Sequence, residues 1–410
     1  MISERQTLGA SIAERRRALG MSQDDLARLM DVSRTIVSAW ENDHRRPPAD
    51  RVARLGEVLE DRGELARLWA QPDDRHAPPL FAVPVSVTTL RRQAVNGLVE
   101  HLSVDEAADQ EPGYGWRFDL DDASQSLSAL STAYGLKAVL LAGGRHWRVS
   151  LPRIRAMLRR LELDSGGWGT ARQGMARPEI TAVVVSALHD AGDDDEFVAD
   201  RIGLLIDGLR SRVEGPEPAR PYVLTTSLLE LSRLEVDLTI GRRFIDDLID
   251  LSTLDGGERS WPVVVKASPL ATSEPATVPT AGAVCALAAW ARRLADDRLH
   301  RVADEGRCWL ERHGDLALDD EWIRTDKPDG GEDLLAVRHF TPAWVLRAVV
   351  EAGGDPSTGI AGLALREMLS YYVPETCLWR WPRGGGSYPV WMTYHALAAL
   401  MSWACAIEVG

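Results

Sequence analysis

The sequence has little cysteine and no long apolar run, and both deficits limit what the protein can do. Its four cysteines, Cys285, Cys308, Cys377 and Cys405, are scattered rather than closely paired. Zinc sites need closely spaced ligands, so we expect no metal and no cofactor. Cys285, Cys308 and Cys405 have apolar neighbours in the sequence, and we expect them to be buried reduced thiols. No apolar run reaches the roughly twenty residues that cross a bilayer, and no signal peptide precedes the first predicted helix. We therefore expect a cytoplasmic protein without membrane contact.

An excess of positive charge is also missing. The formal net charge is −14, and residues 1–70 are neutral because they hold twelve arginines and twelve acidic residues. A neutral segment beside an acidic remainder argues against strong non-specific binding to nucleic acid. Specific binding by a dimer is still allowed, because two half-sites multiply the affinity. With 410 residues and 45% hydrophobic content, the chain can form more than one domain and a large core.

The N-terminal part of the sequence carries the pattern of two short helices joined by a turn. Ser22 is suited to the N-cap position, and Asp25, three residues later, completes an aspartate version of the capping box. The first helix then presents Leu26, Leu29 and Met30 to a core.

The second predicted helix begins at Ser33, which can cap it. Its side chains divide between two faces. The apolar residues that face the core are Ile36, Val37 and Trp40, and the polar residues that project on the other side are Arg34, Thr35 and Ser38. Further helices at residues 8–19 and 50–59 are expected to pack around this pair, which gives a small bundle.

This segment resembles the XRE-type helix-turn-helix of phage repressors and bacterial regulators over roughly the first sixty residues. The landmarks are Ser-Gln-x-x-Leu-Ala from Ser22, Val-Ser-Arg from Val32 and Trp-Glu-Asn from Trp40. The resemblance implies binding of double-stranded DNA by a homodimer, with Gln23 contacting backbone or base. It also implies a recognition surface formed by Ser33, Arg34, Thr35 and Ser38.

Individual side chains refine the implied DNA contact. Arg34 is the candidate for a bidentate hydrogen bond to a guanine edge. His44, Arg45 and Arg46 follow the second helix and suit phosphate contacts, which fix register without reading sequence. Ala39 stands where many relatives carry a long polar residue, so the base-reading surface is smaller here. The alternative is a helix-turn-helix that has lost DNA contact and serves as a protein-binding or dimerising module.

The composition changes after this bundle. Four prolines, Pro72, Pro78, Pro79 and Pro84, are typical of a semi-rigid linker, and Ala- and Leu-rich helical segments follow them. We predict an all-α protein with a helix-turn-helix domain at residues 1–70, a Pro-rich linker at 71–90 and a helical domain at 91–410.

A repeated unit organises the predicted helical domain. In each copy a loop with glycine or tryptophan precedes a helix that starts at proline or threonine and is rich in alanine. The loop tryptophans are Trp116, Trp168, Trp261, Trp322 and Trp381, and the copy at Tyr222 has the helix but lacks the tryptophan. About six units recur at roughly forty to sixty residues, and a unit of this size needs neighbours to bury its apolar face.

The Gly-Gly-Trp-Gly around Trp168 and the Pro-Glu-Ile-Thr-Ala from Pro178 resemble repeats of squalene cyclases, terpene cyclases and protein prenyltransferases. Those families share an α/α toroid with a central cavity. The resemblance therefore implies a toroid of about six helical hairpins over most of residues 110–410. It concerns the fold and does not by itself imply an activity.

One acidic motif raises the question of catalysis. Asp119-Leu120-Asp121-Asp122 reproduces the Asp-x-Asp-Asp motif of class II terpene cyclases. The resemblance implies that Asp121 protonates an alkene while Asp119 and Asp122 hold it neutral and aimed. The alternative is that these carboxylates cap a helix start. Those cyclases build their cavity between two helical domains, and this chain has room for only one.

Aromatic residues gather near the C-terminus of the chain. Trp344, Trp391, Tyr394 and His395 are candidates for lining a pocket for a hydrophobic small molecule, with simple filling of the core as the alternative. Prenyltransferases bind zinc through an Asp-x-Cys pair and a distant histidine. Because Cys285 lacks such an aspartate, zinc-dependent prenyl transfer is not expected.

Three functional hypotheses remain open. The first is a DNA-binding transcriptional regulator whose toroid senses a hydrophobic small molecule or a protein, which must then prefer one of two arrangements of the molecule. The second is a terpene-cyclase-like enzyme that carries the helix-turn-helix as a targeting module. The third is a protein-binding scaffold in a stress- or phage-response system. We favour the regulator, with a toroid that has no enzymatic activity.

Overall fold

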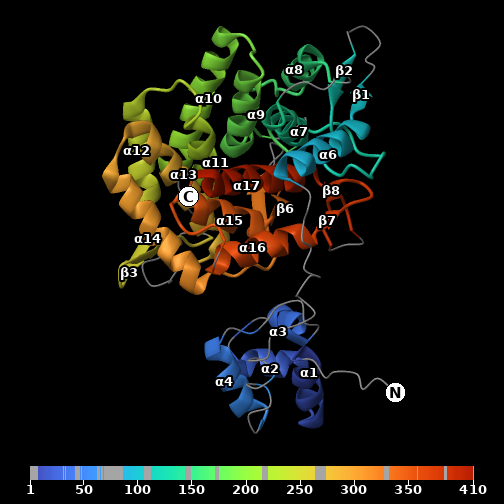
Figure 1. The fold of residues 1–410 in the computed structure, drawn as a ribbon, viewed down its shortest axis with the longest axis vertical. Coiled ribbons are helices and arrows are strands. Elements are labelled where there is room, and N and C mark those ends of the chain that lie inside the picture. The colour runs from blue at the N-terminus through green and yellow to red at the C-terminus, as the bar shows by residue number, and fades with distance from the viewer. Residues whose placement is uncertain are drawn as a thin grey trace. The chain divides into compact units, whose positions relative to one another are not determined.

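The computed structural model describes residues 8–30, 32, 34–41, 47, 49–61, 65, 68, 86–105, 112–143, 149–170, 175–214, 220–263, 274–326, 332–357, 359–382 and 386–409. The chain divides into two compact units, Met1–Ala82 and Val83–Gly410 (Figure 1). Each unit has a hydrophobic core of its own.

The first unit is a bundle of short helices around one small core. Its helices are α1 (Leu8–Ala18), α2 (Gln23–Met30), α3 (Arg34–Glu41) and α4 (Ala49–Val58). The predicted capping box at the start of α2 is present, because the backbone N–H of Asp25 donates to the Ser22 hydroxyl at 3.1 Å and the N–H of Ser22 donates to the Asp25 carboxylate at 2.9 Å. Val37 and Trp40 are buried, as predicted, and α2 and α3 pack on each other.

The prediction that Leu29 on α2 faces the core is wrong. Leu29 is 46% exposed, whereas Leu26, Ala27 and Met30 are buried. The buried residues form a stripe at positions i, i+1 and i+4 of the helix, and this spacing places Leu29 outside it.

The second unit is built from alternating outer and inner helices, which confirms the α/α toroid. The outer helices are α6 (Val87–Glu100), α8 (Leu151–Arg160), α10 (Asp195–Glu214), α12 (Leu238–Asp250), α14 (Asp297–His313) and α16 (Gly359–Ser370). The inner helices are α7 (Ala129–Leu141), α9 (Pro178–Asp190), α11 (Pro221–Leu231), α13 (Thr277–Leu294), α15 (Thr341–Glu351) and α17 (Val390–Val409). Each inner helix contacts the next, and α17 returns to α7, so the ring is closed. Helix α6 begins at Val87, inside the range predicted as linker.

A tryptophan joins an outer helix to the following inner helix in four of the described repeats. The indole N–H of Trp168 donates to the carbonyl of Leu158 on α8 at 2.8 Å, and its backbone N–H donates to the hydroxyl of Thr181 on α9 at 3.1 Å. The same pair of bonds recurs in three further copies, at Trp116 with Leu98 and Thr132, at Trp261 with Leu248 and Thr280, and at Trp379 with Met368 and Thr393. Gly167, beside Trp168, has φ +73°, a conformation that glycine adopts without strain.

The prediction assigned the wrong tryptophan to the last repeat. Trp379 makes the repeated bonds there, while Trp381 packs against Trp391 with ring centroids 5.6 Å apart. Both tryptophans lie in the same loop, so sequence spacing did not distinguish them. Trp322 lies on strand β5, and its side chain is outside the described residues.

Antiparallel two-stranded hairpins occur in four of the connections that lead from an outer to an inner helix. The pairs are β1 (Ser103–Asp105) with β2 (Gly113–Gly115), β3 (Thr253–Asp255) with β4 (Glu258–Ser260), β5 (Asp319–Asp326) with β6 (Glu332–His339), and β7 (Tyr372–Val373) with β8 (Leu378–Trp379). Outer and inner helices alternate along the chain, so these connections all lie at the end of the ring where the inner helices begin.

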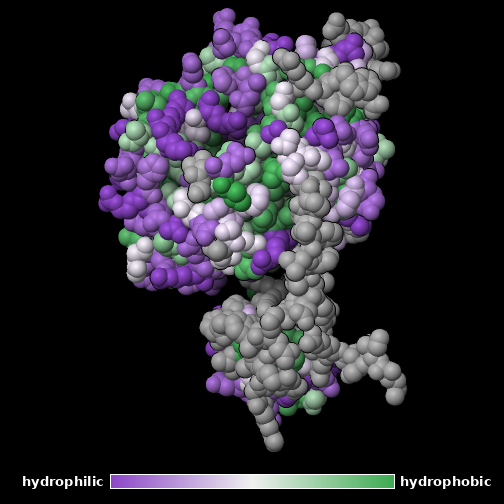
Figure 2. All heavy atoms as spheres, viewed as in Figure 1, coloured by the Kyte–Doolittle hydropathy of each residue, from purple (hydrophilic) through white to green (hydrophobic). Residues whose placement is uncertain are grey.

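Helix α17 is more apolar than predicted from the sequence. Its stretch Val390–Glu408 is long and apolar enough to cross a membrane by length and composition, contrary to the prediction that no such run exists. Of this stretch, 61% is buried inside the protein, as expected of an inner helix of the ring. Figure 2 shows hydrophobic residues around the C-terminal half of α17, between hydrophilic outer helices.

Candidate functional site

The start of α2 and the end of α3 are joined by a buried carboxylate. Glu41 accepts two hydrogen bonds from the Arg16 guanidinium and one from the Gln23 side-chain amide, at 2.9 Å. Burial opposes ionisation of Glu41, but the bonds from Arg16 and Gln23 outweigh it and keep its pKa below the usual range. This network fixes the angle between α2 and α3. It also holds the side chain of Gln23, which the sequence predicted to contact DNA.

Arg34 lies at the first residue of α3 and projects into solvent. Its side chain is 67% exposed, and among the described residues its ion-pair partner is Asp24 at the start of α2, at 3.9 Å. An exposed pair at this distance binds weakly, so the guanidinium can exchange Asp24 for another partner. The structure therefore places Arg34 beside the N-terminus of α2, where Gln23 lies.

The remaining predicted DNA contacts are only partly within the described residues. Ser38 is partly exposed on α3. Thr35 lies on α3, but its side chain is outside the described residues. Ser33, His44, Arg45 and Arg46 also lie outside the described residues, so their roles stay predictions.

The acidic motif at residues 119–122 forms a hydrogen-bonded loop before α7. The Asp119 carboxylate accepts the backbone N–H of Tyr388 at 3.1 Å, which ties this loop to the start of α17. The Asp122 carboxylate accepts bonds from Ser124 and Gln125, and the Ser124 bonds lower its pKa. Asp121 is exposed. The carboxylates of Asp119 and Asp122 thus hold the loop together, as the structural alternative expects.

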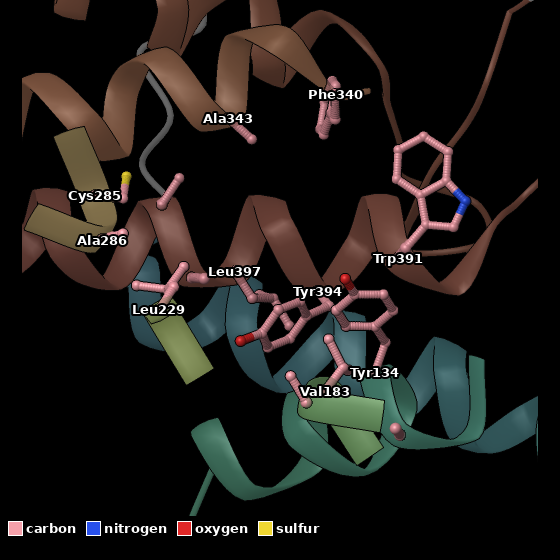
Figure 3. Packing of buried hydrophobic residues seen from close by; sticks show 14 of the residues in the cluster. Tyr134, Val183, Leu229, Cys285, Ala286, Phe340, Ala343, Trp391, Tyr394 and Leu397 are labelled. Carbon is pink, nitrogen blue, oxygen red and sulfur yellow. The ribbon is translucent and has the colours of Figure 1, made fainter. Parts of the chain in front are cut away.

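Aromatic side chains from three inner helices meet inside the ring. The His395 ring on α17 lies 4.8 Å from that of Trp344 on α15 and 5.2 Å from that of Tyr134 on α7, measured between centroids. Tyr134 and Tyr394 lie side by side, 4.9 Å apart (Figure 3). We call Tyr134, Trp344, Tyr394 and His395 the aromatic cluster. The sequence singled out three of its four members but missed Tyr134.

Trp391, the other predicted pocket residue, does not belong to this cluster. It is 6% exposed and packs against Trp381 near the start of α17. Figure 3 shows its indole away from the tyrosine rings. Trp391 is the second residue of α17, whereas Tyr394 and His395 lie about one turn further on.

The pKa of His395 is lowered in the folded protein. Burial, followed by the charges of Arg347, His339 and Lys137, lowers its pKa to about 3. The imidazole is therefore neutral near pH 7, and one ring nitrogen can donate while the other accepts. Burial also raises the pKa of Tyr134, which keeps its hydroxyl protonated.

A layer of buried ion pairs lies next to the aromatic cluster, further along the inner helices. Lys137 on α7 donates to Glu230 on α11 at 2.7 Å and to Ser186 on α9 at 2.8 Å. Burial opposes the charge of Glu230, but Lys137 outweighs it and lowers its pKa. Arg347 pairs with Glu351 at 2.5 Å on α15. Lys137 thus bridges three inner helices, and nothing in the spacing of the sequence indicated that it would.

The cysteines do not gather into a site. Cys285 is buried, and burial raises the pKa of its thiol, as predicted for a structural cysteine. Cys308 and Cys377 are partly exposed, and Cys405 is exposed on the C-terminal half of α17, so the prediction that Cys308 and Cys405 are buried is wrong. No group of three metal-binding side chains occurs among the described residues.

Comparison with known families bears on the first unit. Residues 12–60 match the family model HTH_3, described as Helix-turn-helix. These residues include α2, α3 and α4. The first unit is an XRE-type helix-turn-helix domain. A search of curated protein sequences finds no match to the chain.

Solved structures resemble the second unit in fold. A family 76 glycoside hydrolase from a bovine Bacteroides thetaiotaomicron strain has a TM-score of 0.53 at 7% identity. The match covers 80% of this chain and 79% of the hydrolase chain. An inactive variant of an α-1,6-mannanase of Salegentibacter sp. HEL1_6, in complex with α-1,6-mannotetrose, has a TM-score of 0.51 at 10% identity, covering 78% and 99%. An unsaturated glucuronyl hydrolase specific for heparin has a TM-score of 0.50 at 10% identity, covering 78% and 98%. At such identities the likeness shows a shared toroid fold and no shared activity.

These neighbours change the interpretation of the toroid. The sequence resemblance pointed to terpene cyclases, whereas the structural resemblance is to toroids of glycoside hydrolases. The likeness gives terpene cyclisation no support. The helix-turn-helix domain supports DNA binding, as predicted.

Proposed function

We propose that this protein is a sequence-specific transcriptional regulator that binds double-stranded DNA through its helix-turn-helix domain. The observation that carries the proposal is the exposed Arg34 at the first residue of α3. A recognition helix presents its N-terminal residues to base edges in the major groove, and arginine is the side chain best suited to guanine. Ser33, Thr35 and Ser38 complete the proposed recognition surface, and Gln23, His44, Arg45 and Arg46 are the proposed flanking contacts.

Dimeric binding belongs to the proposal. The helix-turn-helix domain has no excess positive charge, so a single copy gains little from phosphate neutralisation. Two copies on paired half-sites reach useful affinity because the second contact is intramolecular. Such binding implies a cytoplasmic protein with access to DNA.

Fluorescence anisotropy tests the DNA-binding proposal. The full chain is titrated with labelled DNA from upstream of its own gene in the presence of scrambled competitor. We expect competitor-resistant binding that Arg34→Ala weakens by roughly fivefold to a hundredfold, since a bidentate base contact is worth about 1–3 kcal/mol. Arg28→Ala is the matched control, because Arg28 is 77% exposed on α2 and, among the residues that the structure describes, pairs with Asp25 alone.

Two outcomes contradict the proposal. Binding that competitor removes completely shows that the protein does not read sequence. Equal losses in Arg34→Ala and Arg28→Ala show that only net charge matters.

We further infer that the toroid senses a ligand and does not catalyse hydrolysis. Glycoside hydrolases use two carboxyl groups, one of which must be protonated. The buried carboxylates inside this ring are instead paired with cations, Glu230 with Lys137 and Glu179 with Arg177. A carboxylate held in an ion pair is a poor general acid or base. The aromatic cluster beside these ion pairs is suited to binding a small molecule.

A further inference from the structure

The C-terminal half of α17 carries a largely apolar face that reaches the surface of the toroid. Residues three and four apart share one face of a helix, so Met401, Ala404, Cys405 and Glu408 lie together. Cys405 and Glu408 are exposed, and Met401 and Ala404 are partly exposed. Ile407, at the edge of this face, is 46% exposed. We call these five residues the α17 stripe.

Hydrogen bonds on the opposite face of α17 fix the direction in which the stripe points. The Ser402 hydroxyl donates to the carboxylate of Glu351, the last residue of α15, at 3.0 Å. The indole N–H of Trp403 donates to the carbonyl of Pro356, in the loop after α15, at 2.9 Å. These bonds hold α17 against its neighbour and keep the stripe turned outward. A contiguous apolar face that is held exposed is typical of a protein–protein contact.

Two opposite charges flank the α17 stripe. Arg91 on α6 lies at one end, with its Nη1 3.1 Å from the sulfur of Met401. Glu408 lies at the other end, two turns further along α17. Within the part of the chain that the structure describes, neither side chain has an ion-pair partner. A face with a cation at one end and an anion at the other is complementary to a second copy of itself.

A two-fold axis between Ala404 and Cys405 brings the opposite charges of two copies together. In an antiparallel helix pair around this axis, Met401 of one copy lies opposite Glu408 of the other. Because Arg91 contacts Met401, each copy then places its Arg91 beside the Glu408 of its partner. The small side chains of Ala404 and Cys405 lie at the crossing point and allow the two helices to approach closely.

The chain enters the toroid beside the same stripe. The second unit begins at Val83, and Arg91 is the fifth residue of its first helix. A two-fold axis through the stripe therefore brings close together the points at which the two helix-turn-helix domains are attached. Binding to paired half-sites needs two such domains in one molecule.

We propose that the α17 stripe is the surface through which two copies of this chain form a dimer. The proposal rests on the dimeric DNA binding proposed above and gives it a location in the toroid. The contact buries little area on its own. It acts together with the paired half-sites, because the stripe makes the second DNA contact intramolecular.

Reversal of the two charges tests the pairing. Sedimentation equilibrium of the full chain is expected to show a dimer at micromolar concentrations. Glu408→Arg and Arg91→Glu each place like charges opposite one another, and each is expected to raise the dimer dissociation constant by roughly threefold to thirtyfold. The variant with both changes is expected to recover most of the wild-type affinity. Glu196→Arg, at an exposed position of α10, is the control.

Three results of this measurement overturn the proposal. The first is a wild-type chain that stays monomeric. The second is a dimer that both single reversals leave unchanged, and the third is a double variant that associates no better than the single ones.

Cross-linking locates the two-fold axis. Cys405 lies beside the proposed axis, so the thiols of the two copies lie close together. A short bismaleimide, which alkylates two thiols, is expected to give a covalent dimer of the wild type that Cys405→Ser abolishes. Cys377→Ser is the matched control, because Cys377 is also a partly exposed cysteine but lies outside the stripe. A covalent dimer that persists in Cys405→Ser, or its absence in the wild type, overturns the site.

The stripe and the regulator fail in different ways. Sequence-specific DNA binding by a chain that Cys405 does not cross-link removes the stripe and keeps the regulator. A dimer that depends on the stripe but does not bind upstream DNA keeps the stripe and removes the regulator.

Discussion

Single buried charges hold the functional parts of both units in place. Glu41 joins α1, α2 and α3 through Arg16 and Gln23, and Lys137 joins α7, α9 and α11 through Ser186 and Glu230. A buried charge is costly unless it is paired and hydrogen-bonded, so removal of one partner costs more than the pair contributes. Two predictions concern these side chains.

The first is that Glu41→Gln destabilises the helix-turn-helix domain by about 1–3 kcal/mol, because Arg16 loses its charged partner. Glu57→Gln, a change at an exposed position of α4, is the control. The pKa of Glu41 is lowered in the folded state. Its contribution is therefore present above the ordinary glutamate pKa of about 4.3 and is lost as the pH falls below it. Denaturation monitored against pH checks this, and a Glu41→Gln protein with the same acid sensitivity as the wild type contradicts it.

The second is that Lys137→Met destabilises the toroid by about 3–5 kcal/mol, because it leaves Glu230 buried and unpaired. Adding Glu230→Gln to Lys137→Met is expected to restore a large part of this loss. Chemical denaturation of the single and double variants measures the coupling. Additive losses in the double variant show that the two side chains do not act as a pair.

The tryptophan loops make each helical hairpin a unit of the ring. The threonine that binds the tryptophan backbone is the fourth residue of α7, α9, α13 and α17. The fourth residues of α11 and α15 are Leu224 and Trp344. Trp344 is thereby free of the repeated bond and belongs to the aromatic cluster. The departure from the repeat coincides with the aromatic cluster.

We predict that Thr181→Val destabilises the toroid by about 1–3 kcal/mol, because the buried backbone N–H of Trp168 loses its acceptor. Thr226→Val on the inner helix α11 is the matched control, since Thr226 is partly exposed and makes no hydrogen bond to a loop tryptophan. Denaturant unfolding followed by tryptophan fluorescence compares the two. Equal effects assign the loss to the helix and not to the Trp–Thr bond.

The two units have separate cores, and this determines how the protein unfolds. The small core of the helix-turn-helix domain and the large core of the toroid share no residues. Domains with independent cores unfold in separate cooperative steps.

We therefore predict two transitions in differential scanning calorimetry of the full chain. Glu41→Gln is expected to shift only the transition of the helix-turn-helix domain, and Lys137→Met only that of the toroid. A single transition that both variants shift together contradicts the independence of the units.

Local signals in the sequence determined the helix-turn-helix and the existence of the repeat. The capping box at Ser22, the apolar pattern of α3 and the Gly-Trp loops depend on contacts between residues close in the chain, so spacing alone reveals them. Periodicity did not show that Leu29 faces solvent. It also did not show that Trp379, and not Trp381, makes the hydrogen bonds of the last repeat.

Only the tertiary structure decided what lies inside the ring. Lys137 on α7 meets Glu230 on α11, and Tyr134 on α7 meets Tyr394 on α17, because these helices belong to one closed ring. More than half the length of the chain separates Tyr134 from Tyr394. Side chains so far apart in sequence leave no periodic signal, and their charge and hydrogen bonding are set by neighbours that only the closed ring provides. The sequence alone therefore predicted an apolar pocket, whereas the assembled ring brings the tyrosine hydroxyls and the His395 imidazole together.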